Sequence, residues 1–302
     1  MAGFLTGITG LKVGHYTDKD ALTGCTAVLC EGGAVAGVDV RGCAPGTRET
    51  DLLRGYNLVE RVHAVMLCGG SAYGLDAASG AMQYLEEKGV GFVIGVGVVP
   101  IVPAAVIFDL GVGDYKVRPG KQEGYAACAT AQSGAFETGS AGAGTGATVA
   151  KLYGPMFAAK GGLGTCCIDL FGGVKVAAIA VVNALGEIYD PDTGKLVAGA
   201  NAGGRPLTDA EKMQAMAAAA GNTTIGVVAT NAALTREEAN KLAAIAHDGL
   251  ALTIRPVHTP YDGDTFFGLS TLEIPGVPFA AVLAAAVRAV TGAVLSAVGI
   301  DK

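Results

Sequence analysis

The junction between an alanine-rich run and a β-branched run is the feature of this sequence that most restricts its fold. An alanine-rich run at residues 217–220 meets Gly221, Asn222 and Thr223, and a β-branched run follows directly. The Gly-Asn pair after the alanines is typical of a helix that ends in a turn, and the β-branched residues predict a buried strand. The pattern therefore places the hydroxyl of Thr223 at the mouth of a strand, directly after a turn.

The position of Thr223 suggests a chemical use for this hydroxyl. Its Oγ can attack the carbonyl of Asn222, and an N→O acyl shift followed by ester hydrolysis would free Thr223 as a new N-terminus. Thr223 would then carry both the nucleophile, Oγ, and the base, its own α-amine. Because a free α-amine has a pKa of about 8, it can accept the Oγ proton near neutral pH without a histidine.

Two simpler interpretations of the same residues stay open at this point. A Gly-Asn-Thr junction is most often only a helix stop and a strand start. Asn222, Thr223 and Thr224 also match the N-x-[ST] glycosylation acceptor, which means little without a secretory signal. The choice between a structural junction and self-cleavage therefore depends on the rest of the chain.

Composition narrows the class of protein. The chain has 302 residues, of which 51% are hydrophobic, and this is enough for a substantial core. A formal net charge of −6 and the lack of a long basic run argue against nucleic-acid and anionic-membrane partners. The N-terminus lacks a signal-peptide pattern, the seven cysteines form no C-x-x-C, and the four histidines have no zinc-site spacing. We therefore expect a cytoplasmic protein with reduced thiols, no metal and no cofactor.

Two long apolar segments could be mistaken for membrane spans. Residues 89–108 carry no charge, but Pro100, Pro103 and several glycines among the valines favour buried strands. Residues 279–300 are rich in alanine and are interrupted by Arg288, so they predict a core helix. No membrane partner is expected.

The order of the predicted elements indicates the fold class. Strands are predicted at residues 11–16, 25–30, 34–40, 62–67, 162–170, 174–182 and 224–230, with a hairpin at 188–196 and a further strand ending at Ser270. Helices are predicted at 69–87, 123–133, 207–220 and 235–249 and at the C-terminus. Because the helices are grouped between blocks of strands, we expect a layered α+β domain rather than alternating βαβ units.

Several polar residues are candidates for chemistry. Asp262 and Asp264 lie two apart at a strand entry, so both would project to one face, although solvated acids in an Asp-Gly turn are the simpler alternative. Asn183, at the end of an apolar strand, could donate its amide to an oxyanion or cap a turn. Lys151 follows the glycine-rich loop 139–147 and could hold a carboxylate or polarise a carbonyl, although lysines are mostly exposed.

Two further motifs fit their patterns incompletely. Residues 69–74, Gly-Gly-Ser-Ala-Tyr-Gly, miss the G-x-S-x-G nucleophile elbow because the closing glycine comes one place late, which weakens Ser71 as a nucleophile. Residues 142–147 fit G-x-G-x-x-A, but no apolar strand leads into them, so a dinucleotide site lacks its structural context.

Five motifs follow one another along the chain: residues 48–51 (RETD), 69–74 (GGSAYG), 105–109 (AVIFD), 222–225 (NTTI) and 258–265 (HTPYDGDT). Together and in this order, they resemble the family of L-aminopeptidase/D-Ala-esterase, β-peptidyl aminopeptidases and nylon-oligomer hydrolases. The resemblance spans nearly the whole chain. It implies a self-processing N-terminal-nucleophile amidohydrolase with the αββα sandwich shared with ornithine acetyltransferases. It also implies one catalytic domain, residues 1–302, cut into chains 1–222 and 223–302 and assembled as a homotetramer.

The resemblance also implies roles for individual residues. Thr223 matches the nucleophile, and Asp262 and Asp264 match the acids that orient it in nylon-oligomer hydrolases. Asn183 matches the oxyanion-site asparagine, and Lys151 matches the active-site lysine.

Three residues are expected to bind substrate: Ser71, Tyr73 and Phe108. Phe108 stands where the nylon-hydrolase branch has an active-site tyrosine, so that hydroxyl is lost or its role passes to Tyr73. The Asn222-Thr223 pair and the two acids are closer to the nylon-hydrolase branch than to aminopeptidases with serine after glycine. The expected substrates are small peptides, amino acid amides or nylon-type oligomers. An L/D- or β-aminopeptidase, an acyltransferase of the same fold, and an unprocessed binding protein remain the alternatives.

Overall fold

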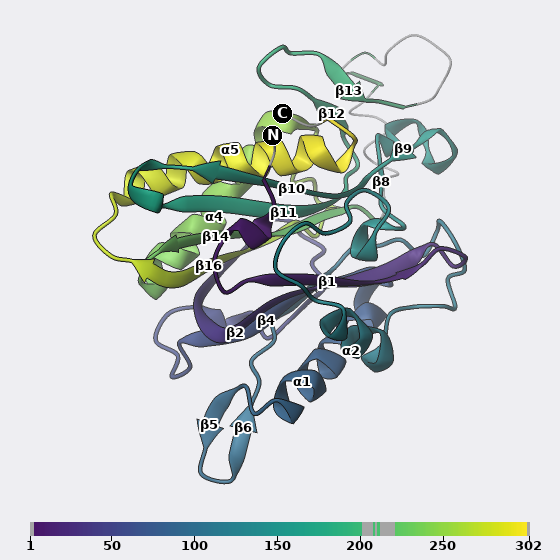
Figure 1. The fold of residues 1–302 in the computed structure, drawn as a ribbon. Coiled ribbons are helices and arrows are strands. Elements are labelled where there is room, and N and C mark those ends of the chain that lie inside the picture. Colours follow the sequence, from purple (N-terminus) through teal and green to yellow (C-terminus); the bar gives the residue numbers. More distant parts are fainter. Residues whose placement is uncertain (1–2, 201–207, 209, 212–220, 301–302) are drawn as a thin grey trace.

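The computed structural model describes residues 3–200, 208, 210–211 and 221–300, which form two β-layers between two pairs of helices (Figure 1). The strands of the main sheet are β1 (Lys12–Asp18), β2 (Thr23–Val40), β3 (Thr47–Arg48), β4 (Arg61–Cys68), β7 (Ala104–Val106), β10 (Gly162–Asp169), β11 (Lys175–Asn183), β14 (Thr223–Ala232) and β16 (Thr265–Ile274). Their order is β10-β11-β14-β16-β2-β4-β7-β3, with β1 also paired to β2.

The remaining elements are shorter strands and the helices. The strands are β5 (Phe92–Ile94), β6 (Gly97–Val99), β8 (Thr148–Val149), β9 (Ala159–Lys160), β12 (Glu187–Tyr189), β13 (Leu196–Ala198) and β15 (Ile254–Arg255). The α-helices are α1 (Ala77–Glu87), α2 (Lys121–Ala129), α4 (Arg236–Thr253) and α5 (Phe279–Ala297). The 3₁₀ turns are η1 (Leu5–Gly7), η2 (Asp51–Leu53), η3 (Ser71–Asp76), η4 (Gly142–Gly144), η5 (Lys151–Tyr153), η6 (Pro155–Phe157) and η7 (Phe171–Gly173).

The long strand β2 joins the two β-layers. Its first part pairs with β1 and β4, and residues 35–40 pair with β16. The register with β4 shifts between Leu29 and Ala34, and Gly33 within this interruption has a φ of +79°. Because a bulge bends a strand and glycine adopts positive φ without steric cost, β2 can turn from one layer into the other.

Three apolar clusters fill the three spaces of the sandwich. The central cluster joins both β-layers and includes Val28, Ile179 and Phe267. A second cluster lies between the layer of β10, β11, β14 and β16 and the helices α4 and α5, and it contains Phe266. A third, which contains Met66, lies under α1 and α2. Since Phe266 and Phe267 are neighbours on β16, they face opposite sides of that strand. This is the αββα arrangement predicted from the sequence.

The C-terminal helix α5 is part of this sandwich. It is long and apolar enough to cross a membrane by length and composition alone. It packs on β10, β11 and α4, where it supplies the outer helical layer drawn in yellow in Figure 1. The predicted core helix is therefore confirmed.

The expectation of buried strands throughout residues 89–108 is wrong in its first part. Strand β7 is buried, but β5 and β6 form a separate hairpin that projects from the sandwich (Figure 1). Val93 and Val96 in this hairpin are 77% and 94% exposed. Apolar composition predicted strands here, but it could not tell whether a neighbouring layer covers them.

Two predictions concern the segment between residues 188 and 220. The hairpin is confirmed: β12 and β13 pair, and the N–H of Gly194 donates to the carbonyl of Asp190 over 2.8 Å. For the helix at 207–220, the N–H of Glu211 donates to Thr208 Oγ1 over 3.3 Å, as expected of a cap. Most of that predicted helix lies outside the described residues.

We predict that Gly37→Ala destabilises the fold because α4 packs directly on this part of β2. A Cβ at residue 37 would lie 2.2 Å from the backbone N of Asn240 and 2.4 Å from the carbonyl carbon of Ala239. Such overpacking costs about 1–3 kcal/mol of the free energy of unfolding, measurable by urea denaturation. The matched control is Gly97→Ala, whose Cβ would meet nothing within 4 Å. Equal stability of both variants would contradict the close contact of β2 and α4.

Candidate active site

Three adjacent strands of the main sheet bring predicted site residues together where β11 ends and where β14 and β16 begin. Strand β11 ends at Asn183, β14 begins at Thr223, and Asp264 directly precedes β16. Asn183 and Thr223 are cross-strand partners. Asn222 and Asp262 form a parallel bridge just before β14 and β16 pair. The predicted position of Thr223 at a strand mouth is therefore confirmed.

Around Thr223, a hydroxyl and an N–H meet at one carbonyl oxygen. Asn222 and Thr223 are 2% and 4% exposed. Thr223 Oγ1 donates a hydrogen bond to the carbonyl oxygen of Asn222, and the N–H of Gly263 donates to the same oxygen over 3.1 Å. A Cβ on Gly263 would lie 3.0 Å from Thr223 Oγ1 and 2.7 Å from the carbonyl oxygen of Ala44. Glycine at 263 therefore lets this backbone donor approach the bond between Asn222 and Thr223.

Asn183 organises the other side of the site. Its Oδ1 accepts from Lys151 Nζ over 2.8 Å and from the N–H of Thr148 over 3.0 Å. Its Nδ2 donates to the carbonyl oxygen of Phe108 over 3.1 Å and, at 3.5 Å, approaches that of Gly221. In the uncut chain the Asn183 amide is thus directed at carbonyls beside the predicted cut. The oxyanion role of Asn183 stays a prediction, and sequence reasoning did not identify the N–H of Gly263.

Lys151 is not the exposed lysine that base rates favour. Its Nζ donates to Asn183 Oδ1 and, over 3.1 Å, to the carbonyl oxygen of Asn183. Burial lowers the pKa of Lys151 to about 7, although the charges of Asp262 and Asp109 act in the opposite direction. A substantial fraction of this amine is therefore neutral near pH 7, when it can accept a proton.

The two predicted acids are buried rather than solvated. Asp262 and Asp264 are 3% and 2% exposed, which excludes the solvated Asp-Gly turn. Asp262 Oδ2 accepts from the N–H and the hydroxyl of Thr259 over 2.7 and 2.6 Å. Asp264 Oδ1 accepts from the N–H of Thr224 over 2.6 Å, and its Oδ2 lies 2.7 Å from His258 Nδ1. Burial, and then the charge of Asp264, raise the pKa of Asp262 to about 6.

His258 and Thr259 contact the two acids, and the sequence analysis quoted them within a motif without assigning them a role. The available signal was their position, since both are polar and stand a few residues before the Asp-Gly-Asp triplet. Only the fold shows that they turn back onto the two acids.

Asp109 is a further buried acid, and it supports the turn next to the site. It is 3% exposed, its Oδ1 accepts from the N–H of Gly70 over 2.6 Å, and its Oδ2 accepts from Thr23 Oγ1 over 2.8 Å. Burial raises the pKa of Asp109, although these hydrogen bonds act to lower it. The carboxylate thereby ties Phe108, its chain neighbour, to the turn that carries Ser71.

The three residues predicted to bind substrate lie at different positions relative to Thr223. The Phe108 ring is 42% exposed and borders Gly221, where an added Cβ would lie 2.5 Å from a ring carbon. Ser71 is half-buried in the turn that Asp109 supports. Tyr73 is 63% exposed, and its ring lies under the guanidinium of Arg118, 4.1 Å from the ring centroid. Among the described residues, no hydrogen bond joins Tyr73 to Thr223, so the structure lends no support to Tyr73 replacing the missing hydroxyl.

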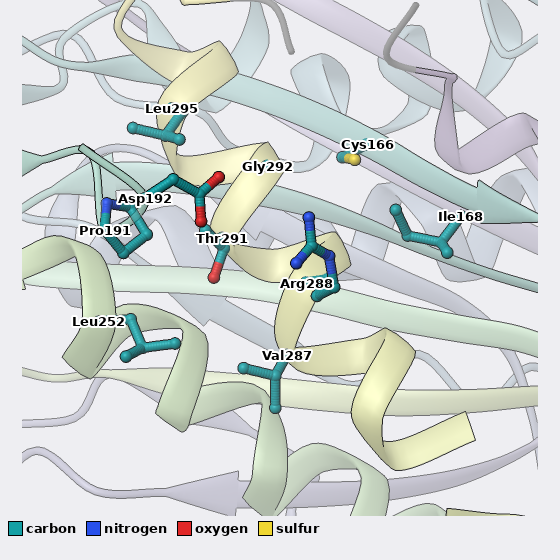
Figure 2. Close-up of a pocket in the computed structure, with 10 residues that line it drawn as sticks. All are labelled: Cys166, Ile168, Pro191, Asp192, Leu252, Val287, Arg288, Thr291, Gly292 and Leu295. Carbon is teal, nitrogen blue, oxygen red and sulfur yellow. The ribbon is translucent and has the colours of Figure 1, made fainter. Parts of the chain in front are cut away.

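A separate cavity of about 400 Å³ opens beside α5 (Figure 2). Its lining comes from α5, α4, β10 and the turn after β12: Cys166, Ile168, Pro191, Asp192, Leu252, Val287, Arg288, Thr291, Gly292 and Leu295. No predicted site residue lines it. Within the described ranges, no group of three or more histidine, cysteine or acidic side chains is placed to hold a metal ion.

Comparison with known sequences decides the family, because residues 4–300 match peptidase family S58. The protein belongs to this family. It is 46% identical over 300 residues to an uncharacterized aminopeptidase of Mycobacterium bovis, covering 93% of this chain and 85% of the relative. It is 34% identical over 275 residues to a 6-aminohexanoate-oligomer endohydrolase of Kocuria sp., covering 88% and 74%.

Solved structures of low sequence identity share the fold of this S58 protein. The L-aminopeptidase D-Ala-esterase/amidase from Ochrobactrum anthropi, described as a new variant among the Ntn hydrolase fold, has a TM-score of 0.75 at 20% identity, covering 98% of this chain and 86% of that one. A Burkholderia sp. β-aminopeptidase has a TM-score of 0.72 at 20% identity, covering 98% and 87%. The predicted N-terminal-nucleophile fold is confirmed. Together with the family and its relatives, it makes this protein a peptidase or amidohydrolase, and the alternative of a non-enzymatic binding protein is wrong.

We predict that Asp109→Asn lowers the free energy of unfolding by about 1–3 kcal/mol, because the new amide group would face the buried donors of Gly70 and Thr23. The measurement is chemical denaturation followed by circular dichroism. The matched control is Asp114→Asn, whose exposed side chain accepts only from the nearby N–H of Lys116 among the described contacts. A loss no larger than that of the control would contradict a supporting role for Asp109.

Proposed function

We propose that this S58 protein is a self-cleaving amidohydrolase with Thr223 as its nucleophile. The observation that carries the proposal is the meeting of Thr223 Oγ1 and the Gly263 N–H at the carbonyl oxygen of Asn222. A hydroxyl beside a carbonyl that a backbone donor polarises is the arrangement from which an acyl shift begins.

Self-cleavage would proceed through an ester. Thr223 Oγ1 loses its proton and attacks the carbonyl carbon of Asn222, while the Gly263 N–H stabilises the negative charge on the oxygen. The C–N bond breaks, the nitrogen of Thr223 takes up a proton, and water hydrolyses the ester. The products are a carboxylate at Asn222 and a free amine at Thr223, giving chains 1–222 and 223–302 of one catalytic domain.

Lys151 is the base we assign to the first proton transfer. It bonds to Asn183, the cross-strand partner of Thr223, and its pKa of about 7 makes the neutral amine available. The charge that Lys151 acquires would lie near Asp262, whose negative charge favours it.

The same site would then hydrolyse external amides. After the cut, the free α-amine of Thr223 accepts the Oγ proton and later delivers it to the leaving amine, with Asp262 and Asp264 as its buried neighbours. Departure of Gly221 and Asn222 would free the Gly263 N–H and the N–H of Asn183 Nδ2 that points toward Gly221. Both could then donate to the oxyanion of the substrate. Water resolves the acyl-enzyme.

The substrates we propose are small amides: short peptides, amino acid amides or nylon-type ω-amino acid oligomers. The names of the relatives point to amino-end cleavage in one case and to internal cleavage of 6-aminohexanoate oligomers in the other. Free and N-acetylated forms of the same oligomer separate the two, because an aminopeptidase requires the free amine. Adding amine acceptors tests acyl transfer, which the fold also permits. We further propose a cytoplasmic enzyme that assembles as a homotetramer of cleaved chains.

We predict that Thr223→Ala stays one chain of full mass and lacks amidase activity, because the variant has no Oγ. Intact-mass spectrometry of the purified protein and an amide panel measure both effects. The matched control is Thr224→Val, which removes the neighbouring hydroxyl, a buried group without a hydrogen-bond partner among the described residues. Cleavage or amide hydrolysis by Thr223→Ala would exclude Thr223 as the nucleophile.

We predict that self-cleavage of the refolded uncut chain accelerates as the pH rises from about 5 to 8. Asp262, with a pKa of about 6, and Lys151, with a pKa of about 7, must both lose their protons. In Lys151→Met the rate should fall at least about tenfold and lose the upper part of this rise. Gel densitometry over time gives the rates, and Lys175→Met, at a largely exposed ion pair, is the control. A rate that increases toward acid pH would contradict this base.

A further inference from the structure

One dipeptide holds both buried acids of the site. Thr259 binds Asp262 through its N–H and hydroxyl, and the adjacent His258 binds Asp264 through Nδ1 at 2.7 Å. Asp264 in turn accepts from the N–H of Thr224 with its other oxygen, over 2.6 Å. His258 is therefore connected, through the single carboxylate of Asp264, to the N–H of Thr224, which follows Thr223 in β14.

The backbone of His258 is held in a costly conformation. Its φ is +53°, in the left-handed region that non-glycine residues rarely occupy and that costs about 1–2 kcal/mol for an ordinary side chain. Strained backbone of this kind clusters at sites where the side chain has a defined task. Here the strain accompanies the placement of the imidazole against Asp264.

The imidazole makes one polar contact. Its Nε2 is buried without a hydrogen-bond partner among the described residues, and its ring meets the ring of His247 edge to face, with centroids 4.9 Å apart. A carboxylate accepts but does not donate, so an ionised Asp264 requires the proton on Nδ1 of His258. The contact to Asp264 therefore fixes which nitrogen of the ring is protonated.

Two buried carboxylates lie in this site, and the charge of Asp264 contributes to the raised pKa of Asp262. Different partners hold them: His258 contacts Asp264, and Thr259 donates to Asp262. Each carboxylate therefore has an orientation of its own, although the two acids are only two residues apart.

We propose that His258 is a positioning residue of this active site, which orients the Asp264 carboxylate toward the backbone at Thr223–Thr224. The inference rests on the proposed self-cleavage at Thr223. His258 touches neither the scissile carbonyl nor a substrate, and it acts through Asp264.

Among the charged and titratable groups around His258, Asp264 is the one that its imidazole contacts by a hydrogen bond. Asp262 and Asp264 face it from its own loop, His247 faces it from α4, and Asp39 of β2 lies near His247. Burial lowers the pKa of His247 to about 4, so that ring is neutral at neutral pH, with Nε2 3.2 Å from the carbonyl oxygen of Asp39.

The test compares the self-cleavage of two variants that accept the left-handed backbone. His258→Gly removes the imidazole and relieves the strain, whereas His258→Asn keeps a neutral donor near the position of Nδ1. Self-cleavage needs no external substrate, so the readout is its first-order rate after refolding, and rescue of that rate by His258→Asn separates a positioning role from a merely structural one. His63→Asn is the control, because it removes another buried imidazole, one that accepts from the N–H of Ile101 on the second β-layer.

We expect His258→Gly to slow cleavage about 10–100-fold, the effect of a misplaced neighbouring group. His258→Asn should recover the rate to within about fivefold of the wild type, since one hydrogen bond is restored. A wild-type rate in His258→Gly would overturn the proposal, and so would equal slowing of both variants. If His258→Gly fails to fold by circular dichroism, His258→Asn is compared with the wild type alone, and slowing well beyond fivefold in this folded variant would overturn the proposal.

Failure of the proposed function gives a different result. A wild-type chain that stays uncut, or a Thr223→Ala chain that cuts itself, would remove self-cleavage at Thr223 altogether. A wild-type chain that cuts itself while His258→Gly does so equally well would remove only the role of His258.

Discussion

The parallel pairing of β14 with β16 is the constraint on which the rest of the site depends. It begins at the bridge between Asn222 and Asp262 and brings the Gly263 N–H onto the carbonyl oxygen next to Thr223. Every residue of β14 is buried, and β14 lies between β11 and β16 in the sheet. The hydrogen bonds between these strands therefore fix the backbone that carries the hydroxyl, the N–H donor and the acids. This suits a reaction that depends on close geometry.

Burial shifts the pKa values of the polar groups in this site. Lys151 and Asp262 lie in surroundings that disfavour charge, and this moves their pKa values toward each other, to about 7 and about 6. In water the same two groups would be fully charged at neutral pH and unable to exchange protons usefully. Asp262 accepts a hydrogen bond from Thr259, and Lys151 donates one to Asn183, and these contacts keep both side chains in place despite the cost of burial. Clustering of groups with perturbed pKa values is expected of an active site.

The sequence predicted the parts of this site that follow from local pattern. A turn before a β-branched run located Thr223, and the end of an apolar strand located Asn183, because residue types change at strand boundaries. No residue pattern indicates the N–H donor of Gly263, since almost every residue has a backbone N–H and only the pairing of β14 with β16 directs this one. The contact of His258 with Asp264 is likewise made from a left-handed backbone conformation, and a histidine in the sequence does not predict that conformation. The exposed hairpin at Val93 was missed because whether a layer covers a strand is a property of the whole sandwich.

In the uncut chain the groups that we propose for catalysis contact the chain itself. The carbonyl of Asn222 occupies the Gly263 N–H, and the amide of Asn183 is directed at the carbonyls of Phe108 and Gly221. An external amide would need those same donors for its own oxyanion, and it would need the α-amine of Thr223, which is still part of a peptide bond. Cutting one bond would thus create the base and release the donors in a single event. Because one geometry would serve both reactions, hydrolysis of foreign amides could not begin before the chain had processed itself.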